Sequence, residues 1–135
     1  MTTTVSELRD GLATNLRTVT GLRVTAEVPD NPNPPQAVVQ LRSVDYNGAF
    51  QRGMTTYNFI ITVLVGRVAE REAQRRLDAY ISNGASSIKL AVESDKTLNN
   101  KAFDVIVSEM TNIGAVLLGE TSYLSADFTA TVYAN

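Results

Sequence analysis

The sequence predicts a single α+β domain over residues 1–135, with helices packed on a mainly antiparallel sheet. Two observations lead to this prediction. The hydrophobic period is helical at first, then alternates through several strands, returns to helical, and ends in strands. A doubly wound α/β fold would instead alternate strictly between strand and helix. In addition, 44% of the residues are hydrophobic and none is cysteine, so the chain must form its core without disulfides.

The first predicted element is a helix that begins at Thr4. Thr4 is followed three residues later by Glu7, which is the pattern of a capping box, and Gly21 is predicted to end the helix in a left-handed conformation. Gly11 costs about 1 kcal/mol relative to alanine, so the helix depends on tertiary packing. Its predicted buried stripe consists of Val5, Leu8, Leu12, Leu16 and Val19.

Three strands are predicted next. Residues 22–28 alternate between apolar and polar and predict a strand with one wet face. The proline-rich segment 29–35 is predicted to be an exposed loop, because proline lacks the amide donor. Further strands are predicted over 37–44 and 54–65. The third strand is apolar on both faces over 59–65, which predicts a central position, covered on both sides.

Helical periodicity returns after Gly66 and predicts a second amphipathic helix with arginines on its outer face. Asn83 and Gly84 are predicted to end it. Ser86 or Ser87 is then predicted to cap a short helix that runs through Val92. The predicted buried stripe of the second helix consists of Ala69, Ala73, Leu77, Tyr80 and Ile81.

The C-terminal part of the sequence predicts strands again. A polar loop is expected over 93–101, a strand over 103–110, and a separate short apolar run over 115–118. Residues 124–132 alternate without interruption, with leucine, alanine, phenylalanine and valine on the predicted inner side. This is the clearest strand pattern in the chain.

Composition argues against catalysis. The chain has no histidine and no cysteine, which excludes Ser-His-Asp and Cys-His pairs, thiolate nucleophiles and the usual zinc or haem ligands. No phosphate-binding glycine pattern occurs, so neither a cofactor nor a metal is predicted. The nearest carboxylate pairs are interpreted as solvated surface groups: Glu70 with Glu72, Glu93 with Asp95, and Glu109 with Glu120. An enzyme is therefore not expected.

Charge and hydropathy limit the classes of partner that the protein is expected to bind. The 12 basic and 14 acidic residues give a net charge of −2, which does not supply the positive field that nucleic-acid binding requires. The N-terminal residues lack the pattern of a signal peptide, and the apolar stretch 59–65 is far too short to cross a bilayer. A soluble protein that is made in the cytoplasm is expected, with no membrane partner.

Two groups of residues are candidates for an interface. Arg67, Arg71 and Arg75 are spaced by four residues, which predicts three guanidinium groups on one helix face. This face is either simply solvated or a docking surface for acidic groups of a neighbouring subunit, because arginine makes forked bonds to carboxylates.

The second candidate is aromatic. Tyr46, Phe50 and Arg52 lie in a glycine-bearing loop, where a hairpin has no need of large aromatic residues. These side chains either fold back onto the domain's own core or insert into a neighbouring protein, since all three residue types are enriched in interfaces.

The order of these features resembles a known family. The features are the capped VSELR segment at 5–9, the strand and proline loop through 28–39, the long strand that runs into an arginine-rich helix, and the GETSYL segment at 119–124 before the alternating strand. Over nearly the whole chain this resembles the tail terminator proteins of long-tailed, siphovirus-type bacteriophages, especially those of actinobacterial hosts.

The resemblance implies a structural virion protein. It implies a hexameric ring that caps the last ring of the tail tube, stops tube polymerisation and offers the surface that joins the head. The implied partners are further copies of the chain, the tail tube protein and the head–tail connector or completion protein. The implied location is the head-proximal end of the phage tail, after assembly in the host cytoplasm.

Other functions are also compatible with the sequence. Another head–tail joining protein or a tail tube protein would have the same small α+β architecture. A monomeric ligand-binding or regulatory domain of a bacterium is a separate class. The native mass with and without tube protein distinguishes them, because a ring or cap indicates assembly and an inert monomer indicates a binding domain.

Overall fold

The computed structural model describes residues 4–19, 22–25, 35–46, 55–67, 71–82, 84, 87–98, 100–118 and 121–134. Within these residues the helices are α1 (Val5–Leu16), α2 (Arg71–Ile81) and α3 (Ile88–Val92). The strands are β1 (Arg23–Thr25), β2 (Gln36–Asp45), β3 (Thr55–Arg67), β4 (Asp104–Leu118) and β5 (Thr121–Ala134).

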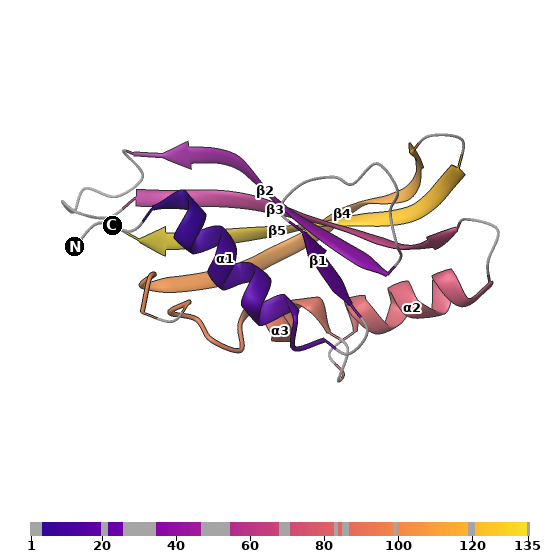
Figure 1. Cartoon of the computed structure of the whole chain (residues 1–135), viewed down its shortest axis with the longest axis horizontal. Coiled ribbons are helices and arrows are strands. Elements are labelled where there is room, and N and C mark those ends of the chain that lie inside the picture. Colours follow the sequence, from indigo (N-terminus) through magenta and orange to yellow (C-terminus); the bar gives the residue numbers. More distant parts are fainter. Residues whose placement is uncertain are drawn as a thin grey trace.

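The strands form one twisted sheet in the order β1-β2-β3-β5-β4 (Figure 1). Only the β1–β2 pair is parallel, and every other described pair is antiparallel. The helices pack against one face of this sheet, where their apolar residues join those of the strands in a single cluster. The predicted α+β class is therefore confirmed. Among the described residues, no helix is both long enough and apolar enough to span a membrane.

Helix α1 begins as predicted. The Glu7 amide donates to Thr4 Oγ1 and the Thr4 amide donates to Glu7 Oε1, both at 3.2 Å, which completes the capping box. The helix ends at Leu16, and Val19 is buried beyond its end. Because Arg17 is the C-cap of α1, the predictions that the helix continues through Val19 and that Gly21 ends it are wrong. Gly21 itself lies outside the described residues. The first helix was thus predicted correctly at its start and along its buried face.

The third strand lies in the middle of the sheet, as its apolar pattern predicted. β3 pairs with β2 on one side and β5 on the other. The helices cover only one face of the sheet. On the other face Leu64 is buried and Ile60 is only half-buried, so the expectation that the strand is covered on both sides holds at Leu64 but not fully at Ile60. β1 is described only over Arg23–Thr25, so the predicted continuation at 26–28 and the proline-rich residues 29–34 lie outside the described part of the chain.

Helix α2 begins later than predicted. β3 continues through Gly66 to Arg67, because an irregularity between Leu64 and Gly66 lets the strand keep its pairing with β5. The predicted stripe is buried at Ala73, Leu77 and Tyr80. Ile81 was expected to be buried but is 37% exposed, since it is the last residue of the helix. Ala69 lies outside the described residues.

The C-terminal half departs from the prediction in one respect. The two separate apolar segments at 103–110 and 115–118 belong to one 15-residue strand, β4. Its pairing with β5 is irregular between Val107 and Glu109 and again between Thr111 and Gly114. Such bulges break the two-residue alternation that marks a strand in sequence, which explains the error. Ser87 caps α3 as predicted, through a 3.2 Å bond from the Leu90 amide.

The sheet face opposite the helices carries polar side chains that bond across strands. Thr62 and Asn112 both donate to the carboxylate of Asp127, at 2.8 and 3.0 Å. Thr131 on β5 donates to Asn58 Oδ1 on β3 at 3.3 Å. These side chains bond across neighbouring strands and hold β3, β5 and β4 in register. Side-chain hydrogen bonds therefore contribute to the stability of this face, on which Val38 and Leu64 are also buried.

Candidate interaction surfaces

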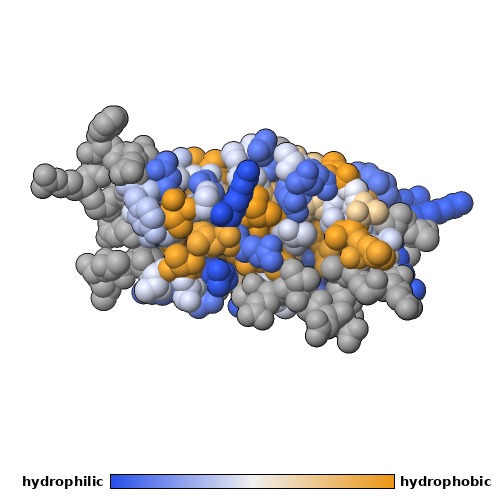
Figure 2. Space-filling view, turned by 90° about the horizontal axis from the view of Figure 1, so that it is seen from above, coloured by the Kyte–Doolittle hydropathy of each residue, from blue (hydrophilic) through white to orange (hydrophobic). Residues whose placement is uncertain are grey.

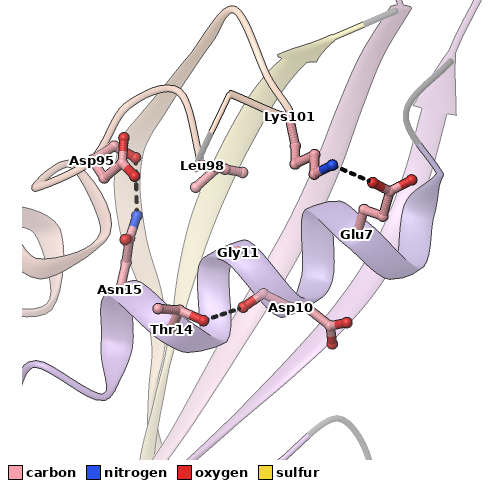
Figure 3. Close-up of a pocket in the computed structure, with 8 residues that line it drawn as sticks. All are labelled: Glu7, Asp10, Gly11, Thr14, Asn15, Asp95, Leu98 and Lys101. Atoms are coloured by element: carbon pink, nitrogen blue, oxygen red, sulfur yellow. Dashed lines mark hydrogen bonds and ion pairs between the residues drawn. The ribbon is translucent and has the colours of Figure 1, made fainter. Parts of the chain in front are cut away.

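A pocket of about 400 Å³ lies between α1 and the segment 95–101 (Figure 3). At one end, the Asn15 side chain donates to the carbonyl oxygens of Val92 and Asp95, at 2.9 and 3.0 Å, and is buried. At the other end, Lys101 Nζ lies 3.0 Å from Glu7 Oε2. Both ends of the pocket thus tie α1 to chain segments more than 75 residues away.

The middle of the pocket depends on a glycine. Leu98 is buried and has a φ of 49°, a conformation that is uncommon for a leucine. A Cβ atom at Gly11 would lie 2.8 Å from Leu98 Cβ. Gly11 therefore has a packing role that its low helix propensity does not reveal, because it lets the segment of Leu98 approach α1 closely.

Gly11→Ala is expected to lower the free energy of unfolding by about 1–3 kcal/mol, as overpacking does. The clash outweighs the gain of about 1 kcal/mol in helix propensity. Urea denaturation followed by circular dichroism measures the change. Ser6→Ala on the exposed side of α1 is the control and should stay within about 0.5 kcal/mol. An alanine variant as stable as the parent chain would contradict the packing role of Gly11.

The polar groups of the pocket bond mainly to one another. A hydrogen bond from Lys101 holds the pKa of Glu7 below its ordinary value of 4.5, and the Thr4 amide adds to this effect. In the part of the chain that the structure describes, no three acidic, histidine or cysteine side chains are grouped as metal ligands. The contacts of Asn15 and of Glu7 with Lys101 hold α1 against the segment 92–101.

The arginine candidates separate into two places. Arg71 and Arg75 lie one turn apart on α2 and both are exposed. Arg75 approaches Glu72 Oε1 at 3.7 Å, an exposed contact that leaves the guanidinium accessible. The prediction that Arg67 shares their helix face is wrong, because Arg67 is the last residue of β3. Arg71 and Arg75, without Arg67, thus share one exposed basic face of α2.

The aromatic candidate is described only in part. Tyr46 follows the end of β2 and is 74% exposed, so it does not fold back onto the core. Phe50 and Arg52 lie outside the described residues, as do the acidic candidates Glu70 and Glu120. Tyr46 therefore remains an interface candidate by its own exposure, and its grouping with the other two stays a prediction.

Sequence reasoning missed a clamp on the edge strand β4. The Val107 amide donates to Glu93 Oε2 at 3.0 Å, and Lys89 Nζ donates to the Val107 carbonyl at 3.3 Å. Lys89 also pairs with Glu93 itself. We call these two residues of α3 and its C-cap the edge clamp. They occupy backbone groups of β4 that a neighbouring strand would otherwise bind.

The charge of Glu93 is stabilised by the same contacts. Burial of the carboxyl group alone would raise its pKa, but the hydrogen bonds from Lys89 and the Val107 amide outweigh burial and lower the pKa below 4.5. Just upstream, the Val105 amide donates to the side chain of its own neighbour Asp104 at 2.9 Å. The sequence pairs Glu93 only with Asp95, whereas its partners in the structure are Lys89 and the Val107 amide.

The other half of β4 has no comparable protection among the described residues. Residues 110–118 contain no charged side chain. Ile113 and Leu117 are 55% and 65% exposed. We call residues 113–117 the open edge. Figure 2 shows the molecule from above the view of Figure 1, with apolar patches among hydrophilic side chains, one of them toward the end where Figure 1 places the β4–β5 hairpin.

Comparison with known proteins adds no family assignment. No known protein-family model matches the chain, and no curated protein matches it significantly.

Proposed function

We propose that the protein is a tail terminator of a long-tailed bacteriophage. In this role it forms a ring, six copies in number, on the last ring of the tail tube, ends tube polymerisation and offers the surface to which the head connector joins. The observation that carries the proposal is the resemblance in element order and segments over nearly the whole chain. The partners are further copies of the chain, the tail tube protein and the connector or completion protein.

The surfaces of the domain are compatible with this role. A closed ring needs heterologous contacts, in which one surface of each subunit meets a different surface of the next. The exposed guanidinium groups of Arg71 and Arg75 and the exposed ring of Tyr46 lie on separate elements, α2 and the end of β2. Arginine and tyrosine are both enriched where proteins meet, which supports their use in such contacts.

The experiment is a capping assay with purified tube protein. A terminator should stop growing tubes at a defined length and accept heads. A tail tube protein, the nearest alternative, should polymerise by itself. Native mass measured with and without tubes separates both from a monomeric binding domain, which would remain a monomer and leave tube length unchanged.

Arg71→Glu combined with Arg75→Glu is expected to abolish capping. The change places negative charge where acidic partners of the arginines are expected, while thermal stability stays nearly the same because exposed charges contribute little to folding. Arg17→Glu with Arg42→Glu reverses two exposed arginines elsewhere and is the control. Tube length by electron microscopy and head joining are the measurements.

A parallel variant tests the aromatic candidate. Tyr46→Ala with Phe50→Ala should weaken docking through the loss of anchor side chains. If this variant and the arginine variant both cap tubes of normal length and accept heads, neither surface is the interface. The terminator role itself would be overturned by a parent chain that leaves tube growth unchanged.

A further inference from the structure

We infer that the open edge of β4 binds the open edge of a second copy of the chain, as an antiparallel pair of strands about a two-fold axis. This contact is independent of the proposed ring, because it joins two identical surfaces, whereas a ring joins two different ones. The inference rests on where β4 lies in the sheet, how its two halves differ, and which side chains the pairing would bring together.

The first step is the contrast between the two halves of β4. β4 is an edge strand, and edge strands are usually protected by charge, bulges or covering groups. In the first half the edge clamp and Asp104 satisfy the amides of Val107 and Val105. The second half carries no charge over residues 110–118 and exposes Ile113 and Leu117. An apolar edge without charges is the kind of segment that pairs with another strand.

The second step is that the pairing is limited in length. β4 is irregular between Thr111 and Gly114, and Asn112 there has a φ of 56°. The side chain of Asn112 is held by Asp127 at 3.0 Å, so the irregularity is fixed to the next strand. A bulge bends the strand and interrupts its ladder. Regular pairing with β5 resumes at Gly114, the neighbour of Ile113. A second strand can therefore follow the edge from Leu117 as far as Ile113, but it cannot continue in register past the irregularity along the clamped half.

The third step is the match of the segment to itself. An antiparallel pair centred on Ala115 places Ile113 opposite Leu117 of the other copy, twice, and Gly114 opposite Val116. Opposite residues must lie on the same sheet face. Gly114 and Val116 satisfy this condition, since they pair with Ser125 and Tyr123, which are two residues apart on β5.

The same register suits size and charge. The two exposed apolar side chains, Ile113 and Leu117, would cover each other, and the small Ala115 would lie on the axis, where two copies approach closely. Gly114 leaves room for Val116. No charged residue lies within the paired segment, so no like charges meet. These properties favour a second copy of the chain over an acidic or basic partner strand.

The position of the segment leaves access to it. Figure 1 shows the far end of the β4–β5 hairpin at the upper right, away from α1 and α3. The side chains of Ile113, Ala115 and Leu117 are all exposed. Pairing of two copies there would join two five-stranded sheets into one continuous sheet.

The test measures the mass of the isolated chain by sedimentation velocity over a wide range of concentration, with no tube protein present. We expect a monomer–dimer equilibrium. Leu117→Lys should raise the dissociation constant at least about tenfold. Leu90→Lys is the matched control, because Leu90 is 47% exposed on α3, far from the open edge in sequence, and this variant should dimerise like the parent.

Charge pairs test the register itself. Ile113→Lys with Leu117→Glu places opposite charges across the axis and should restore dimers, whereas Ile113→Lys with Leu117→Lys places like charges there and should not. A parent chain that is monomeric at every concentration overturns the inference, as do dimers that are insensitive to Leu117→Lys. Rings that depend on Leu117 would assign the edge to a head-to-tail contact and also overturn it. None of these results depends on tube capping, so the terminator proposal stands or fails separately.

Discussion

Phe59→Ala is expected to lower the free energy of unfolding by about 3–5 kcal/mol. Phe59 is fully buried on β3, the middle strand of the sheet, and its ring faces the helices. Its neighbours across the sheet are Leu41 on β2 and Ala130 on β5. Removal of the ring leaves a cavity that these strands cannot close without losing their register. The loss of stability should therefore lie near the upper end of the range for core substitutions.

Chemical denaturation measures this change, provided that the free energy of unfolding depends on denaturant concentration with the same slope in both proteins. Ile60→Ala, on the adjacent position but the opposite sheet face, is the control, since Ile60 is only half-buried and should cost clearly less. A loss below about 1 kcal/mol for Phe59→Ala would mean that the ring is not enclosed and that β3 is not the centre of the core.

Glu93→Ala is expected to lower the free energy of unfolding by about 2–3 kcal/mol, because hydrogen bonds to charged groups are worth more than neutral ones. The variant leaves the Val107 amide without its acceptor and Lys89 without its partner. Glu93→Gln keeps an acceptor oxygen but removes the charge, so it should lie between the alanine variant and the parent. Glu109→Ala, which removes an exposed carboxylate of β4, the strand that contains Val107, is the control.

The edge clamp also predicts a pH dependence. The pKa of Glu93 is lower in the folded chain than its ordinary value of 4.5, so the unfolded chain binds the proton more readily. The contribution of Glu93 to stability is therefore complete at a pH above 4.5, the ordinary pKa. It is lost as the pH falls from there through the lower pKa of the folded chain. Glu7 has a lowered pKa as well and adds to the same loss of stability with falling pH. When denaturation is measured from neutral pH down to the acid range, the free energy of unfolding should fall less steeply for Glu93→Gln than for the parent. Equal slopes would contradict the clamp.

The spacing of hydrophobic residues along the sequence predicted most of the fold. The capped start of α1 follows from the spacing of Thr4 and Glu7, and the central position of β3 from a segment that is apolar on both faces. The inner face of β5 follows from hydrophobic residues at every second position. The errors fall where a bulge interrupts the period. The irregularity at Leu64 and Gly66 hid the end of β3, and those within β4 divided one strand into two. A local change in pairing leaves no regular trace in sequence, so these elements could not be predicted from it.

The candidate surfaces were harder to predict than the fold. The four-residue spacing of Arg71 and Arg75 identified an exposed face correctly, but Arg67 was misplaced because its place depends on where β3 ends. The edge clamp joins Glu93 to Val107, fourteen residues later in the chain, and only the packing of α3 beside β4 brings them together. Contacts of this kind depend on the tertiary structure and carry no short-range signal.

The position of β5 has a consequence for how the chain is made. β5 follows β4 in sequence, yet it lies between β3 and β4, and Thr55 pairs with Ala134. During synthesis β3 must therefore wait on the ribosome with one edge unpaired until the residues of β5 have emerged. Pairing over such a separation is slow and exposes the waiting strand to other chains. Chaperones that shield β3 should therefore raise the yield of folded protein, and slower elongation between β4 and β5 should lower it.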